Sequence, residues 1–369
     1  MVFGTRPEAI KLCPVVLDLR CRPQFQVQVC VTAQHRTLLD QVLGAFEIPP
    51  DFDLNLMLPD QTLSQSTSRI LAALEGVMSS VCPDMVLVQG DTTTTLCAAL
   101  AAFYHKVPVG HVEAGLRTWD NWQPFPEEMN RVLTTRLASL HFAATQWAAD
   151  NLQAEGVDPK RIAVTGNTGI DAVLYVRDRL QQGQLRGLDW PQLDPSKKLI
   201  VVTAHRRESF GEGFQRICSA LAQLARRGDV QIVYPVHPNP NVVGPVKENL
   251  AGLANVFLVE PLDYVAFVDL MRRAYLLITD SGGIQEEGPS LGKPILVLRE
   301  KTERPEAVEA GTVRLVGTRV ERILEQARLL LDDPEEYQRM ARVHNPYGDG
   351  CASHRIGDLI LSFLNEKSP

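Results

Sequence analysis

The sequence predicts an α/β protein with parallel sheets, and two features of its apolar pattern carry this prediction. Short apolar runs alternate with segments whose apolar residues recur at helical spacing for most of the 369-residue chain. Such alternation is typical of parallel strands that helices cover on both faces. The runs also fall into two sets of five, which together with the chain length indicates two domains of ordinary size.

The predicted strands follow one another in chain order within these two sets. The first set covers residues 26–33, 84–91, 107–115, 140–145 and 161–167. The second set covers residues 198–205, 230–237, 255–260, 275–281 and 293–299. Helical patterns lie between the strands, for example at 92–104 and 213–227, and two more follow Gly311. After a break at 344–350, residues 352–364 form a last amphipathic helix.

Two places depart from this regular pattern. Met1 to Phe3 would be the end of a first strand, yet a central strand normally runs ~5–6 residues. Either this strand is short or the chain begins late. The domain junction lies near Gly166, just before a helix and the polar, proline-containing stretch 181–198.

Composition and charge exclude several classes of protein. The net charge of -7 and the pI of about 5.7 argue against a general nucleic-acid binder, which carries a basic surface. No apolar run approaches the ~18 residues of a membrane span, and the N-terminus lacks the layout of a signal peptide. The seven cysteines are scattered without a CxxC pair, so we expect reduced thiols in the cytoplasm and no structural metal site.

The residues that follow the predicted strands carry the chemistry, because ligands of open parallel sheets lie beyond the C-terminal strand ends. In "VFGTRPEAIK", Gly4 allows a tight turn into a helix. Arg6 and Lys11 would then flank the exposed N–H groups of that helix, an arrangement that attracts phosphate. An ordinary loop with a surface arginine and lysine is the alternative.

Three carboxylates also occupy such positions. Asp91 ends a strand in "QGDTTTT", Glu113 ends the next in "GHVEAGLRT", and Glu127 opens a helix in "PFPEEMNR". Helix capping is the alternative for Asp91, and stabilisation of the helix dipole is the alternative for Glu127. A carboxylate within a mostly apolar run is costly unless it is paired or used, so a functional role is favoured for Glu113.

The second set of strands begins with a basic cluster. His205 and Arg206 follow its first strand, and Arg304 in "KTERPEAV" adds positive charge. A solvated surface cluster is the alternative, but the place of the first two residues after an apolar strand favours anion binding.

The stretch "TDSGGIQEE" combines glycines with carboxylates. Ser281, Gly282 and Gly283 lead from a strand into a helix whose first N–H groups can hold a diphosphate. Glu287 lies about one turn further on, where its carboxylate would accept hydrogen bonds from ribose hydroxyls. A nucleoside diphosphate has an anionic part that helix N–H groups bind and a ribose diol that a carboxylate binds. The residues at the strand ends together therefore indicate a nucleotide-sugar enzyme that also transfers protons.

A set of motifs runs in unbroken order from Val2 to about residue 365: FGTRPEAIK, TAQHR, GDTTTT, HVEAGLRT, FPEEMNR, TGNTGIDAV, TAHRRESFG, YPVHPNP, DSGGIQEEGPSLGKP and ERPEAVEAGT. In this set the chain resembles the non-hydrolysing UDP-N-acetylglucosamine 2-epimerases of bacteria. No single motif is decisive, but their ordered combination is highly specific.

The resemblance implies two Rossmann-like domains that face each other across a cleft, the glycosyltransferase-B architecture. The N-terminal domain would be residues 1–166 with the C-terminal helix 352–366 crossing back to it, and residues 167–351 would bind UDP. Such enzymes are homodimers that interconvert UDP-GlcNAc and UDP-ManNAc without a cofactor or metal. UDP is eliminated to give a 2-acetamidoglucal and is added back with the opposite configuration at C2.

The same resemblance implies roles for individual residues. The catalytic residues would be Lys11, Asp91, Glu113, Glu127 and His205, and the substrate-binding residues would be Arg6, Phe267, Ser281, Gly282, Gly283, Glu287 and Arg304. A second UDP-GlcNAc molecule would bind as an activator at Gln34, Gln61, Arg206 and His237. Asp60 stands where some relatives carry arginine and would weaken that activator site.

Other functions stay open at this point. The same cleft would serve a 2-epimerase of another UDP-sugar, such as a diacetamido uronic acid, or a hydrolysing epimerase that releases UDP and free ManNAc. A retaining glycosyltransferase of the same architecture would not need acids on both faces of C2. A non-catalytic nucleotide-sugar sensor would be expected to lack one of the acids or His205.

Overall fold

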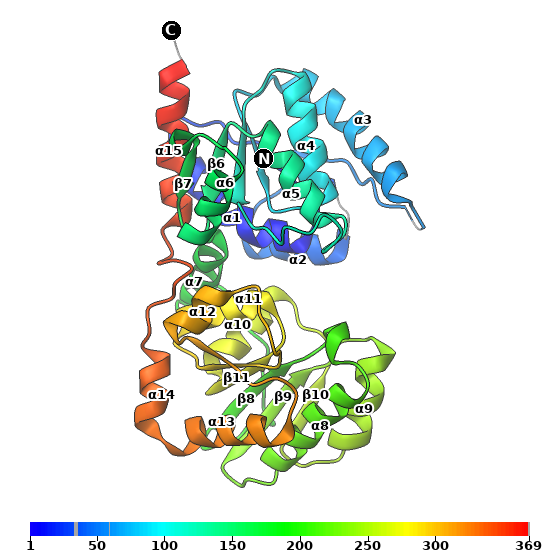
Figure 1. Ribbon diagram of the computed structural model, residues 1–369, viewed down its shortest axis with the longest axis vertical. Helices are drawn as coiled ribbons and strands as arrows, with labels where there is room; N and C mark the ends of the chain where they lie inside the picture. The colour runs from blue at the N-terminus through cyan, green and yellow to red at the C-terminus, as the bar shows by residue number, and fades with distance from the viewer. Residues whose placement is uncertain (33–35, 59, 368–369) are drawn as a thin grey trace. The chain divides into compact units, whose positions relative to one another are not determined.

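The computed structural model describes residues 1–32, 36–58 and 60–367 of the chain, which divide into two compact units (Figure 1). The first unit contains Met1–Ala172 and Gly348–Pro369, and the second contains Val173–Tyr347. The sequence pattern places the junction near Gly166. In the structure the two units divide between Ala172 and Val173, inside helix α7 (Thr168–Gln181). Within the described ranges, no helix is long and apolar enough to cross a membrane.

Parallel strands form the centre of the first unit. Strands β1 (Val2–Phe3), β2 (Cys30–Val31) and β3 (Phe52–Asp53) pair in that order. A second sheet pairs β4 (Val86–Gln89), β5 (Val109–Ala114), β6 (Leu140–Ala143) and β7 (Ile162–Val164) in chain order. Because β1 also packs beside β4, the order of strands reverses between these two, and such a reversal opens a ligand crevice at the C-terminal strand ends.

Helices surround these strands. They are α1 (Arg6–Arg20), α2 (Arg36–Ala45), α3 (Leu63–Val81), α4 (Thr93–Tyr104), α5 (Glu127–Leu137), α6 (Gln146–Ala154), the short 3-10 helix η1 (Pro159–Arg161), the first part of α7, and α15 (Ala352–Lys367). The last of these returns to the first unit and packs against α1, where Arg22 pairs with Asp358 at 2.6 Å.

The second unit has one parallel sheet in the order β10-β9-β8-β11-β12-β13. Its strands are β8 (Lys198–Thr203), β9 (Val230–Pro235), β10 (Val256–Val259), β11 (Leu276–Thr279), β12 (Ile295–Val297) and β13 (Val313–Leu315). Its helices are α8 (Glu212–Leu224), α9 (Pro240–Leu250), α10 (Tyr264–Arg273), α11 (Gly282–Glu287), α12 (Pro305–Ala310), α13 (Val320–Asp332) and α14 (Pro334–Ala341), with 3-10 turns η2 (Arg207–Ser209) and η3 (Gly288–Leu291). Here the strand order reverses between β8 and β11.

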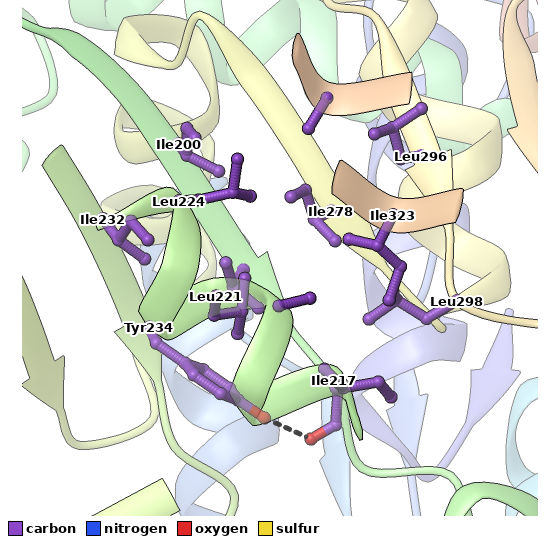
Figure 2. Packing of buried hydrophobic residues seen from close by; sticks show 14 of the residues in the cluster. Ile200, Ile217, Leu221, Leu224, Ile232, Tyr234, Ile278, Leu296, Leu298 and Ile323 are labelled. Atoms are coloured by element: carbon purple, nitrogen blue, oxygen red, sulfur yellow. Dashed lines mark hydrogen bonds between the residues drawn. The ribbon is translucent and has the colours of Figure 1, made fainter. Parts of the chain in front are cut away.

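The core of the second unit fixes the end of β8 (Figure 2). Isoleucines and leucines of the strands, such as Ile200 and Ile278, pack against Leu221 of α8 and are fully buried. Each such side chain contributes roughly 1.5–3 kcal/mol by burial. The buried Tyr234 hydroxyl donates to the carbonyl of Ala204 at 2.8 Å, one residue before His205.

Each predicted strand of the two sets contains a strand of the structure, and the prediction of parallel sheets is confirmed. The strands β3 and β13 were not predicted, and β1 covers Val2–Phe3.

Candidate active site

In the first unit, charged side chains gather at the C-terminal ends of β4 and β5 and on the first turns of α1. Lys11 forms an ion pair with one carboxylate oxygen of Glu113, and the Gln89 side-chain amide donates to the other. The two charged side chains are only 16% and 10% exposed. Glu113 is therefore held in one orientation between a cation and an amide, and its backbone adopts a left-handed φ of 60°, which is uncommon outside glycine and clusters at functional sites.

Asp91 is held by an arginine that the sequence prediction did not include. Arg131 approaches the same oxygen of Asp91 with Nε at 2.9 Å and with Nη2 at 2.8 Å. Its Nη1 atom donates to Glu128 at 2.9 Å. The Asn130 side chain also donates to the Asp91 carbonyl at 2.8 Å. Helix α5 thus positions the carboxylate at the end of β4.

The neighbouring glutamates at the start of α5 differ in their surroundings. Glu128 is buried and accepts hydrogen bonds from the backbone N–H groups of Thr118 at 3.0 Å and Trp119 at 3.2 Å. Glu127 is half-buried, and its Oε2 atom is buried without a hydrogen-bond partner among the described residues. Because buried polar atoms are normally satisfied, this oxygen of Glu127 is a candidate for contact with a substrate.

A buried carboxylate beneath these residues ties their helices together. Glu8 accepts from the N–H groups of Gly4 at 3.0 Å and Thr5 at 2.8 Å, and from the hydroxyls of Thr92 at 2.7 Å and Thr95 at 3.2 Å. Burial raises the pKa of Glu8. A side chain at Gly4 would lie too close to neighbouring threonines, so only glycine fits there. The first turns of α1 and α4 are thereby fixed to each other.

In the second unit, Asp280 organises the end of β8. This fully buried carboxylate accepts from the backbone N–H groups of His205 at 2.6 Å and Arg206 at 2.7 Å. The His205 ring lies 3.3 Å from Asp280 through Nδ1 and stacks on His237 with ring centres 5.3 Å apart. Desolvation lowers the pKa of His205 below its usual value of 6.5 despite the nearby Asp280, so the imidazole is predominantly neutral at pH 7.

Helix α11 and the loop before α12 bring an arginine to the end of β11. Arg304 donates through Nε to the buried Glu286 at 2.9 Å. Its guanidinium also lies over Gly282, where an added Cβ would be 3.1 Å from Cζ. Ser281 is the N-cap residue of α11, and Glu287 is half-buried.

The other predicted residues lie as follows. Arg6 begins α1, Gly283 is exposed on α11, and Phe267 is half-buried on α10. The Gln61 side chain donates to the carbonyl of Leu58 at 3.0 Å, and Gln34 lies outside the described residues. No cluster of three or more His, Cys, Asp or Glu side chains with metal-binding geometry occurs in the described part of the chain.

Sequence reasoning missed Gln89, Arg131, Asp280 and Glu286, which hold predicted residues in place, and Glu8. The Thr-x-x-Glu pattern at Thr5 to Glu8 is a capping-box signal that could have identified the last of these. The other four residues belong to no recognisable sequence motif, because the residues that they contact are distant in the sequence.

Comparison with known proteins gives matches over nearly the whole chain. A family model described as UDP-N-acetylglucosamine 2-epimerase matches residues 17–361. The UDP-N-acetylglucosamine 2-epimerase of Escherichia coli K12 is 58% identical over 364 residues, which cover 97% of each chain. The Neisseria meningitidis UDP-GlcNAc 2-epimerase bound to UDP-GlcNAc superposes with a TM-score of 0.89 at 49% identity, covering 98% of each chain. Staphylococcus aureus MnaA with UDP superposes with a TM-score of 0.88 at 46% identity, covering 100% of this chain and 97% of that one.

Proposed function

The chain belongs to the UDP-N-acetylglucosamine 2-epimerase family, and from this membership we propose how its side chains invert C2 of UDP-N-acetylglucosamine. The enzyme is an isomerase, and its product is UDP-N-acetylmannosamine. One observation supports the assignment of roles most directly. At the strand ends of the first unit Lys11 pairs with Glu113 and Arg131 pairs with Asp91, and at the start of α5 a buried carboxyl oxygen of Glu127 has no hydrogen-bond partner among the described residues.

The chemistry requires two proton transfers at one carbon. The bond between C1 and the UDP oxygen breaks with its electron pair leaving on the diphosphate, while a base removes the proton from C2. A C1–C2 double bond forms, giving 2-acetamidoglucal. In the return step the diphosphate oxygen adds to C1, and C2 takes a proton on its opposite face. Since the C2 proton is weakly acidic, a positioned base and stabilisation of the leaving diphosphate are both needed.

The carboxyl groups of the first unit are suited to the proton transfers. Arg131 pairs with Asp91 and Lys11 pairs with Glu113, so both carboxyl groups are held in fixed orientations. Glu127 has an oxygen that can give or take a proton, because no described side chain or backbone group occupies it. We assign the proton transfers to these three residues and the orientation of Glu113 to Lys11.

The second unit supplies groups suited to the nucleotide. Arg304 and the largely neutral His205 would donate to the departing diphosphate together with the backbone at Ser281, Gly282 and Gly283. Charged and preorganised donors stabilise developing anionic charge without reorganising during the reaction. Glu287 would accept from the ribose hydroxyls, and Phe267 would contact the uracil ring.

Proton NMR in deuterated water tests the reaction. Incubation with UDP-GlcNAc should yield a manno signal together with deuterium at C2 of both epimers. Retention of the C2 proton in the product would contradict the mechanism. Free ManNAc accumulating with UDP would instead identify a hydrolysing epimerase, and turnover of only a diacetamido uronic acid derivative would identify the other alternative substrate.

Isotope exchange from each epimer separately tests the carboxyl roles. For Asp91→Asn, Glu113→Gln and Glu127→Gln, we expect exchange of the C2 proton to fall at least ~100-fold. A variant that blocks exchange only from UDP-GlcNAc acts on the gluco face, and one that blocks exchange only from UDP-ManNAc acts on the manno face. Asp150→Asn, an exposed carboxyl on α6, is the matched control. Unchanged exchange in all three variants would refute the assignment.

Regulation and assembly are also part of the proposal. A second UDP-GlcNAc molecule would bind through Gln34, Gln61, Arg206 and His237, and the acidic Asp60 would oppose its diphosphate. Asp60→Arg should therefore increase activation of the reverse reaction by added UDP-GlcNAc, and an unchanged activation curve would argue against this site. We further propose a cytoplasmic homodimer, for which sedimentation equilibrium gives the mass.

A further inference from the structure

Glu128 directly follows Glu127 in the first turn of α5, but the two carboxyl groups have different surroundings. The side chain of Glu128 is only 2% exposed. Its Oε1 atom accepts from the backbone N–H groups of Thr118 at 3.0 Å and Trp119 at 3.2 Å, and its Oε2 atom accepts from Nη1 of Arg131 at 2.9 Å. Because groups of the protein occupy both oxygens, this carboxylate is suited to hold its neighbours rather than to contact a substrate.

Arg131 is shared between Glu128 and Asp91. Its Nε and Nη2 atoms lie 2.9 Å and 2.8 Å from the same oxygen of Asp91, while Nη1 faces Glu128. A guanidinium group is planar and presents its N–H groups in a fixed fork. A carboxylate at one edge of the fork therefore sets the direction of the other edge. Glu128 is placed to set the direction from which Arg131 holds Asp91.

The same carboxylate holds the loop that joins β5, which ends just after Glu113, to α5. Trp119 in this loop has a left-handed φ of 63°, a conformation that is costly for a residue other than glycine. The side chain of Trp119 is 60% exposed, so burial of the ring is not what fixes this backbone. The hydrogen bond from the Trp119 N–H group to Glu128 is placed to do so.

We propose that Glu128 is a positioning residue for the epimerisation, which acts on Asp91 through Arg131 and fixes the loop that follows Glu113. The inference rests on the proposed function, in which Asp91 and Glu113 transfer protons at C2. Displacement of a reacting group by about 1 Å can cost ~100-fold in rate, so a fixed direction of Arg131 matters for Asp91. The adjacent glutamates then have separate tasks, since Glu127 meets the substrate and Glu128 holds the surrounding elements in place.

Glu128→Gln tests this role in steady-state kinetics. A carboxamide has one acceptor oxygen, so its NH₂ group faces donors either at Arg131 or at the N–H groups of the loop. We expect kcat to fall at least ~10-fold while KM for UDP-GlcNAc changes less than ~2-fold, because misplacement of a base slows the chemistry without removing contacts to the nucleotide. An unchanged kcat, or a loss that appears only in KM, would overturn the proposal.

The same substitution in an Asp91→Asn background shows whether Glu128 acts through Asp91. Exchange of the C2 proton should fall at least ~10-fold when Asp91 is present and less than ~3-fold when it is replaced. Equal factors in the two backgrounds would overturn the inference and leave the role of Asp91 intact. Full exchange in Asp91→Asn alone would instead refute the proposed role of Asp91, and the inference with it.

Glu155→Gln is the matched control for general destabilisation of the first unit. The Glu155 side chain is 10% exposed and accepts from Nη2 of Arg117 at 2.9 Å, so this pair is another buried contact between an arginine and a carboxylate. Both variants should lower Tm, because each leaves a buried arginine with a weaker acceptor. Only Glu128→Gln should lower kcat. An equal loss of kcat in Glu155→Gln would show that destabilisation is sufficient and would overturn the positioning role.

Discussion

We expect two buried histidines to make the first unit less stable at mildly acidic pH. His111 and His141 lie opposite each other on β5 and β6, and each is 1% exposed. His111 Nε2 contacts the carbonyl of Gly90 at 2.7 Å, while Nδ1 of both rings has no hydrogen-bond partner in the described residues. Desolvation is the main cause that lowers the pKa of His111 to about 4 and that of His141 to about 3.

The sign and size of the effect follow from these values. Between pH 6.5 and pH 4 the unfolded chain binds protons at both imidazoles and the folded chain does not, so stability falls as pH falls. From pH 7 to pH 5 each histidine costs about 2 kcal/mol, because each pKa unit corresponds to about 1.4 kcal/mol. Both together should lower the unfolding free energy by about 4 kcal/mol. Below pH 4 the contribution of His111 levels off as the folded state takes up its proton.

Urea unfolding at pH 7 and pH 5, followed through amide exchange protection of β5 and β6, measures this loss. The control is the double variant His111→Gln, His141→Gln, in which other titrating groups such as Glu8 are retained. The difference between the two pH values should shrink by about 4 kcal/mol in the variant. An equal pH dependence in both proteins would refute the reasoning, whatever the stability of the variant at pH 7.

Three further predictions concern the site. Glu8→Gln replaces one of the two acceptor oxygens by an amide donor that faces two of the four donors, and it should lower the unfolding free energy by about 2–4 kcal/mol in urea; an unchanged midpoint would show that the network is not needed. Gly282→Ala sets a methyl group against the Arg304 guanidinium and should raise KM for UDP-GlcNAc roughly tenfold with Tm unchanged, and an unchanged KM would remove Arg304 from the binding site. Arg131→Met leaves Asp91 without its cation and should lower kcat about 100-fold or more, whereas Arg131→Lys should recover part of the loss; equal activities of the two variants would argue against positioning through charge.

The fold was predictable because its strands are buried on both faces. Continuous apolar runs such as 198–205 and 230–237 mark such strands whatever lies around them. The two strands that were not predicted, β3 and β13, are two and three residues long. Both carry a charged residue, Asp53 and Arg314, so neither forms an apolar run. Pairing with a neighbouring strand, which the local sequence does not encode, makes them strands.

The arrangement of the candidate site could be predicted only in part, because the partners of its residues are distant in the sequence. Residues at strand ends, such as Asp91 and Glu113, are marked by their position after an apolar run. The groups that hold them are marked by nothing local. Arg131 reaches Asp91 across 40 positions of the chain, and Asp280 reaches the N–H of His205 across 75. Pairing of β8 with β11 brings Asp280 to His205, and packing of α5 against α4 brings Arg131 to Asp91.

Paired glutamates in the proposed site can support the binding of an anionic ligand. In Glu286–Glu287, as at the start of α5, the two side chains point about 100° apart around the helix. Glu286 turns inward and holds Arg304 by its Nε atom, while Glu287 is half-buried. A carboxylate bound to one edge of a guanidinium fixes its direction, and Glu303 also pairs with Nη1 of Arg304 at 3.1 Å. Glu286→Gln should therefore weaken nucleotide binding although it removes a negative charge. Tighter UDP binding by this variant, measured by calorimetry, would show instead that the carboxylate acts only by repulsion.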